Sequence, residues 1–113
     1  MPPRISQDPM YQLLRDEKVE QFNKLKADGK SCDLTACDFK GLDLRNMDAN
    51  GLDLTDAYFR GADLRSVDFR GATLAGASLA DSKISGCYFP GDITAQEILM
   101  SVNLGTRIRH PSQ

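Results

Sequence analysis

The chain has 113 residues, of which 41% are hydrophobic and 27% are charged, and its formal net charge is −2. This length suits a single domain spanning residues 1–113, and so small a net charge gives no reason to expect direct nucleic-acid binding. No run of about 18 apolar residues is present and the first twelve residues lack the apolar core of a secretory signal, so we expect no membrane span and a cytoplasmic protein.

Residues 9–28 are predicted to form an N-terminal capping helix. Asp8 is a favourable N-cap, Pro9 stands at the first helical position, and Gly29 provides a stop signal. Apolar residues recur along the segment, at Met10, Leu13, Leu14, Phe22 and Leu25. We expect this helix to cover one end of the structure that follows it.

Residues 32–91 divide into twelve consecutive fives without a gap. The third position is Leu, Ile or Phe in eleven of the twelve fives, the second is Asp in seven of the first eight, and the fifth is Gly in seven of twelve. The first position is mostly small or apolar. Apolar residues at the first and third positions share one side of an extended segment, and Gly at the fifth suits a turn. A period of five excludes an α-helix and a coiled coil.

The pattern resembles A-(D/N)-L-x-x, the signature of the pentapeptide-repeat family, over 60 of the 113 residues. The resemblance implies an all-β solenoid, a right-handed quadrilateral β-helix with four fives per coil and therefore about three coils. Third-position residues would then stack in four buried columns. The columns are Leu34–Leu54–Leu74, Phe39–Phe59–Leu79, Leu44–Leu64–Ile84 and Ala49–Phe69–Phe89. Ala49 is the small exception, and Met47 beside it restores the missing volume.

Residues 93–105 are predicted to form a C-terminal helical segment, with the helix itself near 95–104. Thr94 and Glu97 make a capping box, and Gly105 ends the helix. Two interpretations of this helix stay open. It caps its own coil, or it forms a homodimer interface, which the resemblance supports because the family dimerises through its C-terminal end. The candidate self-association residues are Ile98, Leu99, Met100 and Val102.

The last coil, residues 72–91, differs from the other two in its low charge. It carries only Asp81 and Lys83 as charged residues. Its polar and small positions, among them Ser78 and Ala80, are expected to face outward. A nearly neutral surface next to an amphipathic helix indicates that this end of the chain could be an interaction surface.

No catalytic, cofactor-binding or metal-binding residues are predicted, and we do not expect an enzyme. The repeats contain neither His nor Glu, and their Asp residues share one structural position, which indicates a surface and turn role. The three cysteines fit no zinc-binding spacing, and Cys32, Cys37 and Cys87 occupy the inward first position. We expect reduced, buried thiols there. His110 is expected to be exposed in a frayed tail.

These observations favour a non-enzymatic structural or protein-interaction module whose protein partner the sequence does not identify. The resemblance implies one alternative, a DNA mimic that binds DNA gyrase or another topoisomerase and protects it against quinolones. Residues 32–91 hold nine Asp and six Lys or Arg, a net charge of −3. Three coils would span roughly 14 Å, over which duplex DNA carries on the order of eight charges. The charge count therefore argues against mimicry.

Overall fold

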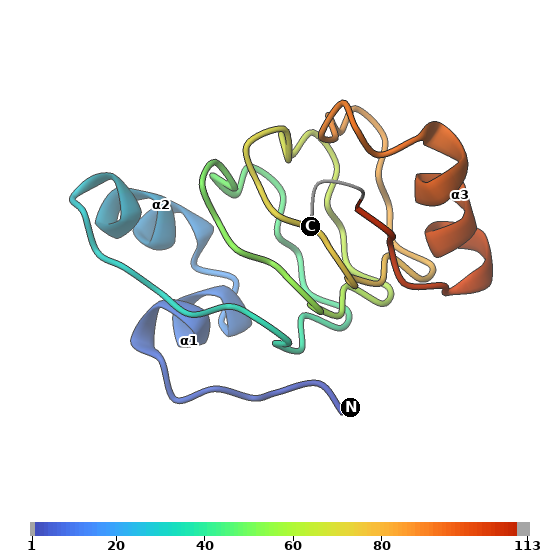
Figure 1. The fold of residues 1–113 in the computed structure, drawn as a ribbon. Coiled ribbons are helices and arrows are strands. Elements are labelled where there is room, and N and C mark those ends of the chain that lie inside the picture. Colours follow the sequence, from blue (N-terminus) through green and yellow to red (C-terminus); the bar gives the residue numbers. More distant parts are fainter. Residues whose placement is uncertain (1, 111–113) are drawn as a thin grey trace.

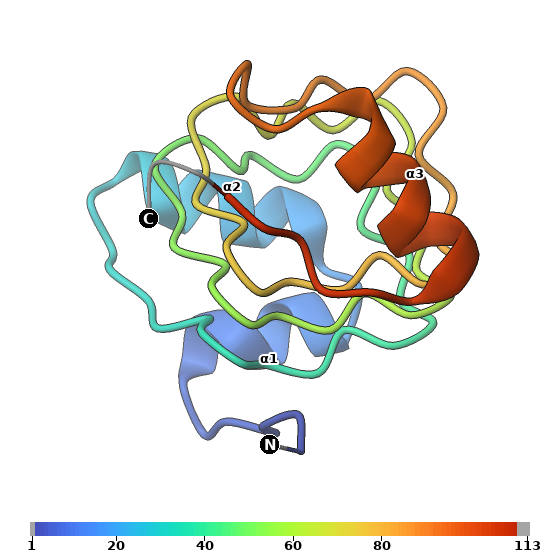
Figure 2. The same cartoon turned by 45° about the vertical axis from the view of Figure 1, so that its right-hand side comes forward.

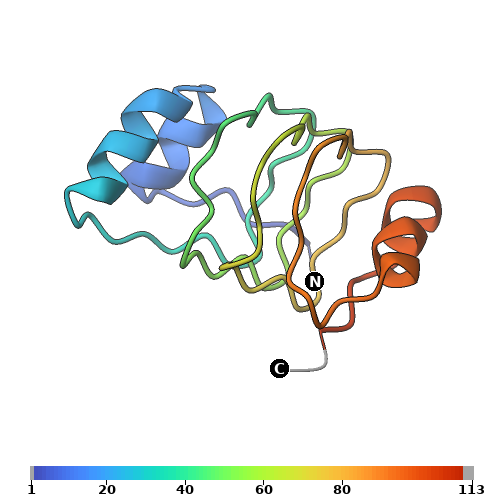
Figure 3. The same cartoon turned by 90° about the horizontal axis from the view of Figure 1, so that it is seen from above.

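The computed structural model describes residues 2–110 and contains three helices. They are α1 (Pro9–Arg15), α2 (Val19–Ala27) and α3 (Ala95–Leu104). Figures 1 and 3 show α1 and α2 at one end of a stack of backbone coils and α3 at the other end. We name residues 32–51 coil one, residues 52–71 coil two and residues 72–91 coil three. Among the described residues, no helix combines the length and the apolar character needed to cross a membrane.

The coils stack with a period of twenty residues. Parallel bridges join residues twenty positions apart, such as Asp43 with Asp63 and Asp63 with Lys83. The repeats therefore fall into four columns. Column one starts at residues 32–36, column two at 37–41, column three at 42–46 and column four at 47–51. The bridges are isolated, and residues 2–110 contain no longer strand. Pairing between coils is thus limited to one bridged residue per repeat.

Two repeat positions, the second and the fifth, shape the turns at which most repeats end. The fifth residue has a positive φ in every repeat except the two that end at positions 71 and 91. Every second-position Asp accepts a hydrogen bond from the backbone N–H two residues later. In Asp68, for example, Oδ1 accepts from the N–H of Arg70 at 2.9 Å. This is the local bond that makes Asp favourable in turns, so the recurrent Asp and Gly have structural causes.

The third-position side chains form the core. Ten of the twelve are at most 1% exposed, and Met47 beside Ala49 is buried as well. Phe39 and Phe59 stack in column two with ring centroids 5.1 Å apart. The exceptions are Ile84 and Phe89, the last members of columns three and four, which are only partly buried. The expectation that all twelve are buried is wrong at these two positions, because no further coil covers them.

The N-terminal segment forms two helices where one helix over 9–28 was expected. The chain reverses at Glu17, which has a φ of 59°. The N–H of Glu17 donates to the Leu14 carbonyl, and the N–H of Lys18 donates to the Leu13 carbonyl. This is the Schellman arrangement that usually needs Gly at its left-handed position. The break was not predicted because Glu stands there instead.

The residues after α3 also differ from the expectation. Instead of fraying, the chain returns along coil three, where Arg107 forms an antiparallel bridge with Ser78; this return runs below α3 in Figure 2. The His110 side chain is only 5% exposed, and its Nε2 lies 2.8 Å from Asp92 Oδ1. Ser78 and Ala80, expected to face outward, are buried. The returning segment and α3 cover this side of coil three.

Candidate functional site

The two ends of the stack differ in how completely their backbone groups are hydrogen-bonded, and this difference defines the candidate site. Between coils, the second-position N–H donates to the coil before it. The N–H of Asp63, for instance, donates to the Leu42 carbonyl at 2.9 Å. Coil one has no earlier coil, so its second-position N–H groups need other acceptors. At the opposite end, coil three has no later coil to pair with.

The N-terminal end is closed in all four columns. Each second-position N–H of coil one finds an acceptor in residues 4–23. The donors are Asp33, Asp38, Asp43 and Asp48, and their acceptors are, in the same order, the Asp8 carboxylate, the Arg4 carbonyl, the Glu17 carboxylate and the Asn23 side-chain oxygen. Tyr11 lies edge-on against Phe39, with ring centroids 5.5 Å apart. The second-position N–H groups of this end are therefore all satisfied.

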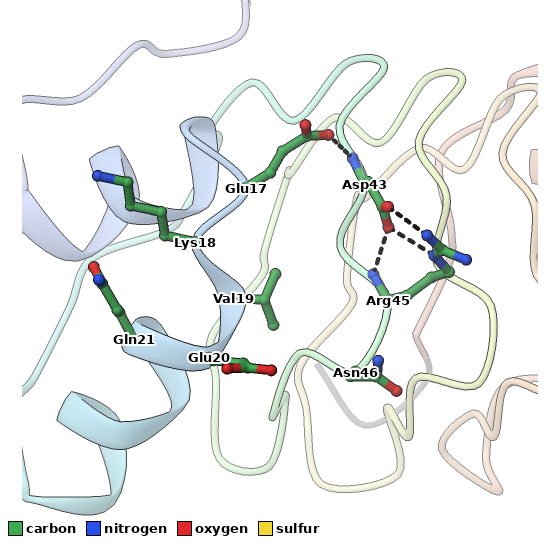
Figure 4. Close-up of a pocket in the computed structure, with 8 residues that line it drawn as sticks. All are labelled: Glu17, Lys18, Val19, Glu20, Gln21, Asp43, Arg45 and Asn46. Carbon is green, nitrogen blue, oxygen red and sulfur yellow. Dashed lines mark hydrogen bonds and ion pairs between the residues drawn. The ribbon is translucent and has the colours of Figure 1, made fainter.

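A surface hollow of about 590 Å³ lies between the α1–α2 junction and coil one, and Figure 4 shows its lining. The Glu17 carboxylate accepts from the N–H of Asp43, and the Asp43 carboxylate binds the Arg45 guanidinium at 2.7 Å. Arg45 also lies 3.6 Å from Asp63. Glu17 thus joins the cap to coil one, and the Asp43 and Arg45 side chains are engaged with each other, so these three charged groups of the hollow already have partners.

Three of the nine Asp residues of the repeats bind an arginine of their own repeat, and four others bind a cation elsewhere in the chain. Arg65 binds Asp63 and Arg70 binds Asp68 through contacts of 2.7 Å. Hydrogen bonds from these guanidinium groups lower the pKa of Asp63 and the pKa of Asp68 to about 2. The carboxylates are thus stable as anions and unsuited to act as general acids or bases near neutral pH.

The cysteines lack the properties of reactive thiols. All three are free. Burial raises the pKa of Cys37 to about 11, and burial likewise raises the pKa of Cys32 and the pKa of Cys87. A nucleophilic cysteine needs a lowered pKa. In residues 2–110 no group of three His, Cys, Asp or Glu side chains is placed to hold a metal ion.

The C-terminal end is covered in columns one and two. The N–H of Gly76 donates to the Ile108 carbonyl, and the N–H of Ile108 donates to the Ala77 carbonyl, both at 2.8 Å. The N–H of Leu79 donates to the buried Ser101 hydroxyl at 2.8 Å. The N–H of Asp81 donates to the Val102 carbonyl. Both α3 and the segment after it therefore replace half of a fourth coil.

Columns three and four of coil three have no such cover, and we call residues 82–91 of this coil the open edge. In coil two, the N–H groups of Leu64, Ser66 and Phe69 donate to coil three. The equivalent N–H groups of coil three have no hydrogen-bond partner within residues 2–110, and neither do two carbonyls of the same edge. The N–H groups are those of Ile84, Gly86 and Phe89, and the carbonyls are those of Ser82 and Cys87.

An apolar groove of about 380 Å³ runs between the open edge and α3, lined by Phe89, Pro90, Ile93, Ile98 and Leu99 together with Gly91 and Ala95. Of the four residues predicted to mediate self-association, Ile98 is buried and Val102 is partly buried against the core. Leu99 is 52% exposed and Met100 is 38% exposed. The structure thus divides the set into two capping residues and two outward residues.

Sequence reasoning missed several residues that close the ends. Leu104, 71% exposed, extends the outward apolar side of α3. Ser101 and Ile108 complete columns one and two, and Asn23 completes column four at the other end. Their positions follow no period, so the sequence offered little signal. The apolar character of Ile108 in an otherwise polar tail was the one available hint.

The repeats also match a family model. The model of pentapeptide repeats finds eight copies, in two overlapping matches over residues 30–65 and 53–91, which together span more than half of the chain. Comparisons with curated proteins and with solved structures returned no match. The bridges at intervals of twenty and the Asp-based turns are the structural counterpart of that repeat. The chain belongs to the pentapeptide-repeat family.

Proposed function

We propose that this protein is a non-enzymatic interaction module. In this proposal the repeats form a right-handed quadrilateral β-helix of about three coils, an all-β solenoid that serves as a rigid scaffold. Four columns of bridges at intervals of twenty residues support that architecture. The raised thiol pKa values and the paired carboxylates support a role other than catalysis. Three unpaired cysteines suit a reducing, cytoplasmic setting.

The observation that carries the proposal is the difference between the two ends. At the N-terminal end the second-position N–H groups are satisfied in all four columns, whereas half of the C-terminal end presents free backbone groups, partly buried apolar side chains and an apolar groove. Exposed edges and apolar patches mark interaction sites or aggregation hazards. Binding of protein partners therefore belongs at the C-terminal end, and a homodimer is the simplest such complex.

The homodimer would form through the outward side of α3. Leu99, Met100 and Leu104 are exposed there, and a two-fold complex requires one self-complementary patch of this kind. We expect an interface at the small end of stable dimers, roughly 1,000–1,500 Å² in total. Sedimentation at tens of micromolar should show a dimer that Met100→Glu weakens while the fold is retained. A wild-type chain that sediments as a monomer at that concentration would contradict self-association.

The alternative, mimicry of DNA toward a topoisomerase, is less well supported. A DNA-like surface needs regularly spaced unpaired negative charge. In this chain Arg45, Arg65 and Arg70 each bind the Asp of their own repeat, which neutralises the rows where such charge would lie. We expect no effect on gyrase supercoiling, or on its inhibition by quinolones, at micromolar protein. Saturable inhibition of supercoiling would favour the mimic instead.

A further inference from the structure

The open edge has a hydrogen-bonding pattern that only an extended backbone can satisfy. The free N–H groups of Ile84, Gly86 and Phe89 and the free carbonyls of Ser82 and Cys87 repeat the pattern by which coil two pairs with coil three. A helix laid against this edge would cover the apolar side chains but would leave these groups unpaired, because helical backbone groups bond within the helix. A strand would cover the side chains and pair the backbone together.

Neither end of a second copy of this chain fits the open edge as a strand. At the N-terminal end of such a copy, the amides that would pair are already taken by residues 4–23. At its C-terminal end, α3 projects past the coils, as Figure 3 shows, and a helix is about 10 Å thick. Two open edges therefore cannot approach to the roughly 4.8 Å that strand pairing requires. The occupant has to be an extended segment of a different protein.

The side chains of the open edge specify the chemistry of that segment. In column three, Asp43, Asp63 and Lys83 follow one another through successive bridges. Lys83 is exposed and forms no ion pair within residues 2–110, whereas Asp63 is bound by Arg65. A residue directly across a bridge from a cation is favourable when it is acidic. The position over Lys83 therefore calls for Asp or Glu.

The neighbouring positions call for apolar residues. Ile84 and Phe89 are partly buried core residues that lack the cover a further coil would give. Phe69 stacks on Phe89 in column four with ring centroids 5.6 Å apart, so an aromatic ring could continue that stack on the other side. The two positions are five residues apart. The matching segment is thus an acidic residue followed by an apolar one, with a second apolar residue five positions after the first.

We propose that the open edge binds an extended acidic–apolar segment of a partner protein by strand addition, as a substitute for the missing half of a fourth coil. The inference rests on the proposed interaction function and names the partner's chemistry at that same end. It uses the open edge, whereas self-association uses the outward side of α3. The two can therefore be tested separately.

A synthetic peptide with the sequence of residues 62–71, ADLRSVDFRG, is a suitable probe. It has Asp in register with Lys83, and Leu and Phe in register with Ile84 and Phe89. The blocked peptide is titrated into the full-length, ¹⁵N-labelled Met100→Glu protein and followed by amide chemical shifts. We expect saturable shifts that are largest at Ile84, Gly86 and Phe89. Absence of binding at millimolar peptide, or shifts centred on α1 and α2, would overturn the proposal.

Two matched controls test the recognition itself. A peptide N-methylated at both Asp residues lacks the two donors for Ser82 and Cys87, and it should bind about tenfold more weakly or worse. Lys83→Glu places like charges across the bridge and should weaken binding about fivefold, whereas Lys40→Glu, which is remote from the edge, should not. Equal binding of the methylated and unmodified peptides would refute strand addition. Peptide binding by a wild-type chain that sediments as a monomer would support this inference while contradicting the homodimer.

Discussion

Replacement of Phe59 by Ala tests how the core is organised along the stack. Phe59 is fully buried in coil two, stacked on Phe39 at 5.1 Å and edge-on to Phe69 at 6.2 Å. Removing a buried Phe ring costs about 3–5 kcal/mol of unfolding free energy. The two ring pairs account for about 1–3 kcal/mol of that value. We therefore expect a large fall in the urea midpoint.

Phe89→Ala is the matched control at the open end. Phe89 is only partly buried and has one ring neighbour, Phe69 at 5.6 Å. Its replacement by Ala should lower the free energy of unfolding by about half as much as that of Phe59, because less buried apolar area is lost and no closed cavity forms. Phe59→Leu, with the residue that column two has at Leu79, should cost about 1 kcal/mol and keeps the comparison possible if Phe59→Ala does not fold. Equal costs at Phe59 and Phe89 would refute an open end.

Three further predictions concern the turns, the charges and the thiols. Gly61→Ala should lower the free energy of unfolding by about 1 kcal/mol, because φ is +68° and the new Cβ would meet free space. Gly76→Ala should lower it further, because its Cβ would lie 2.0 Å from Asp56 Oδ1. Equal urea midpoints for the two variants would contradict the structure. Arg65 lowers the pKa of Asp63 from 3.8 to about 2. The stabilisation that the ionised Asp63 contributes is therefore present above pH 4 and is lost as the pH falls from about 4 to 2. NMR titration of Arg65→Met should show the pKa of Asp63 rising toward 3.8, and an unchanged value would contradict the pairing. Thiol titration without reductant should count three thiols after unfolding, and fewer than three would indicate a disulfide. Before unfolding, the thiols should react slowly, since burial raises all three pKa values.

The repeat itself was predictable because each of its positions has a local cause. Apolar residues at the third position predicted the core, and Asp at the second position predicted the turn that the hydrogen bonds now explain. The left-handed fifth position followed from Gly, although Asn46 and Ser66 adopt the same conformation without being Gly. A strict period lets one observation be checked twelve times, so the sequence alone located the core positions except at Ile84 and Phe89, where the last coil is uncovered.

The ends were harder to predict, because their contacts are made by single residues without a period. Glu17 breaks the expected helix in a left-handed conformation that the sequence pattern does not reveal. Ser101 contributes a buried hydroxyl to column two, and His110 packs on Asp92 where a frayed tail was expected. The candidate site was hard to predict as well, because it consists of backbone groups of coil three that have no hydrogen-bond partner within residues 2–110. Only the three-dimensional arrangement shows which half of the last coil is left open.

Amide hydrogen exchange of the free chain, with Met100→Glu used to suppress self-association, tests the difference between the two ends most directly. The N–H groups of Asp33, Asp38 and Asp48 should be protected, because each donates to residues 4–23. The N–H groups of Ile84 and Phe89 should exchange at nearly unprotected rates, although they belong to core positions of their repeats. Protection of Ile84 and Phe89 as strong as that of Leu64 and Phe69 in coil two would contradict an open edge and the binding proposed for it.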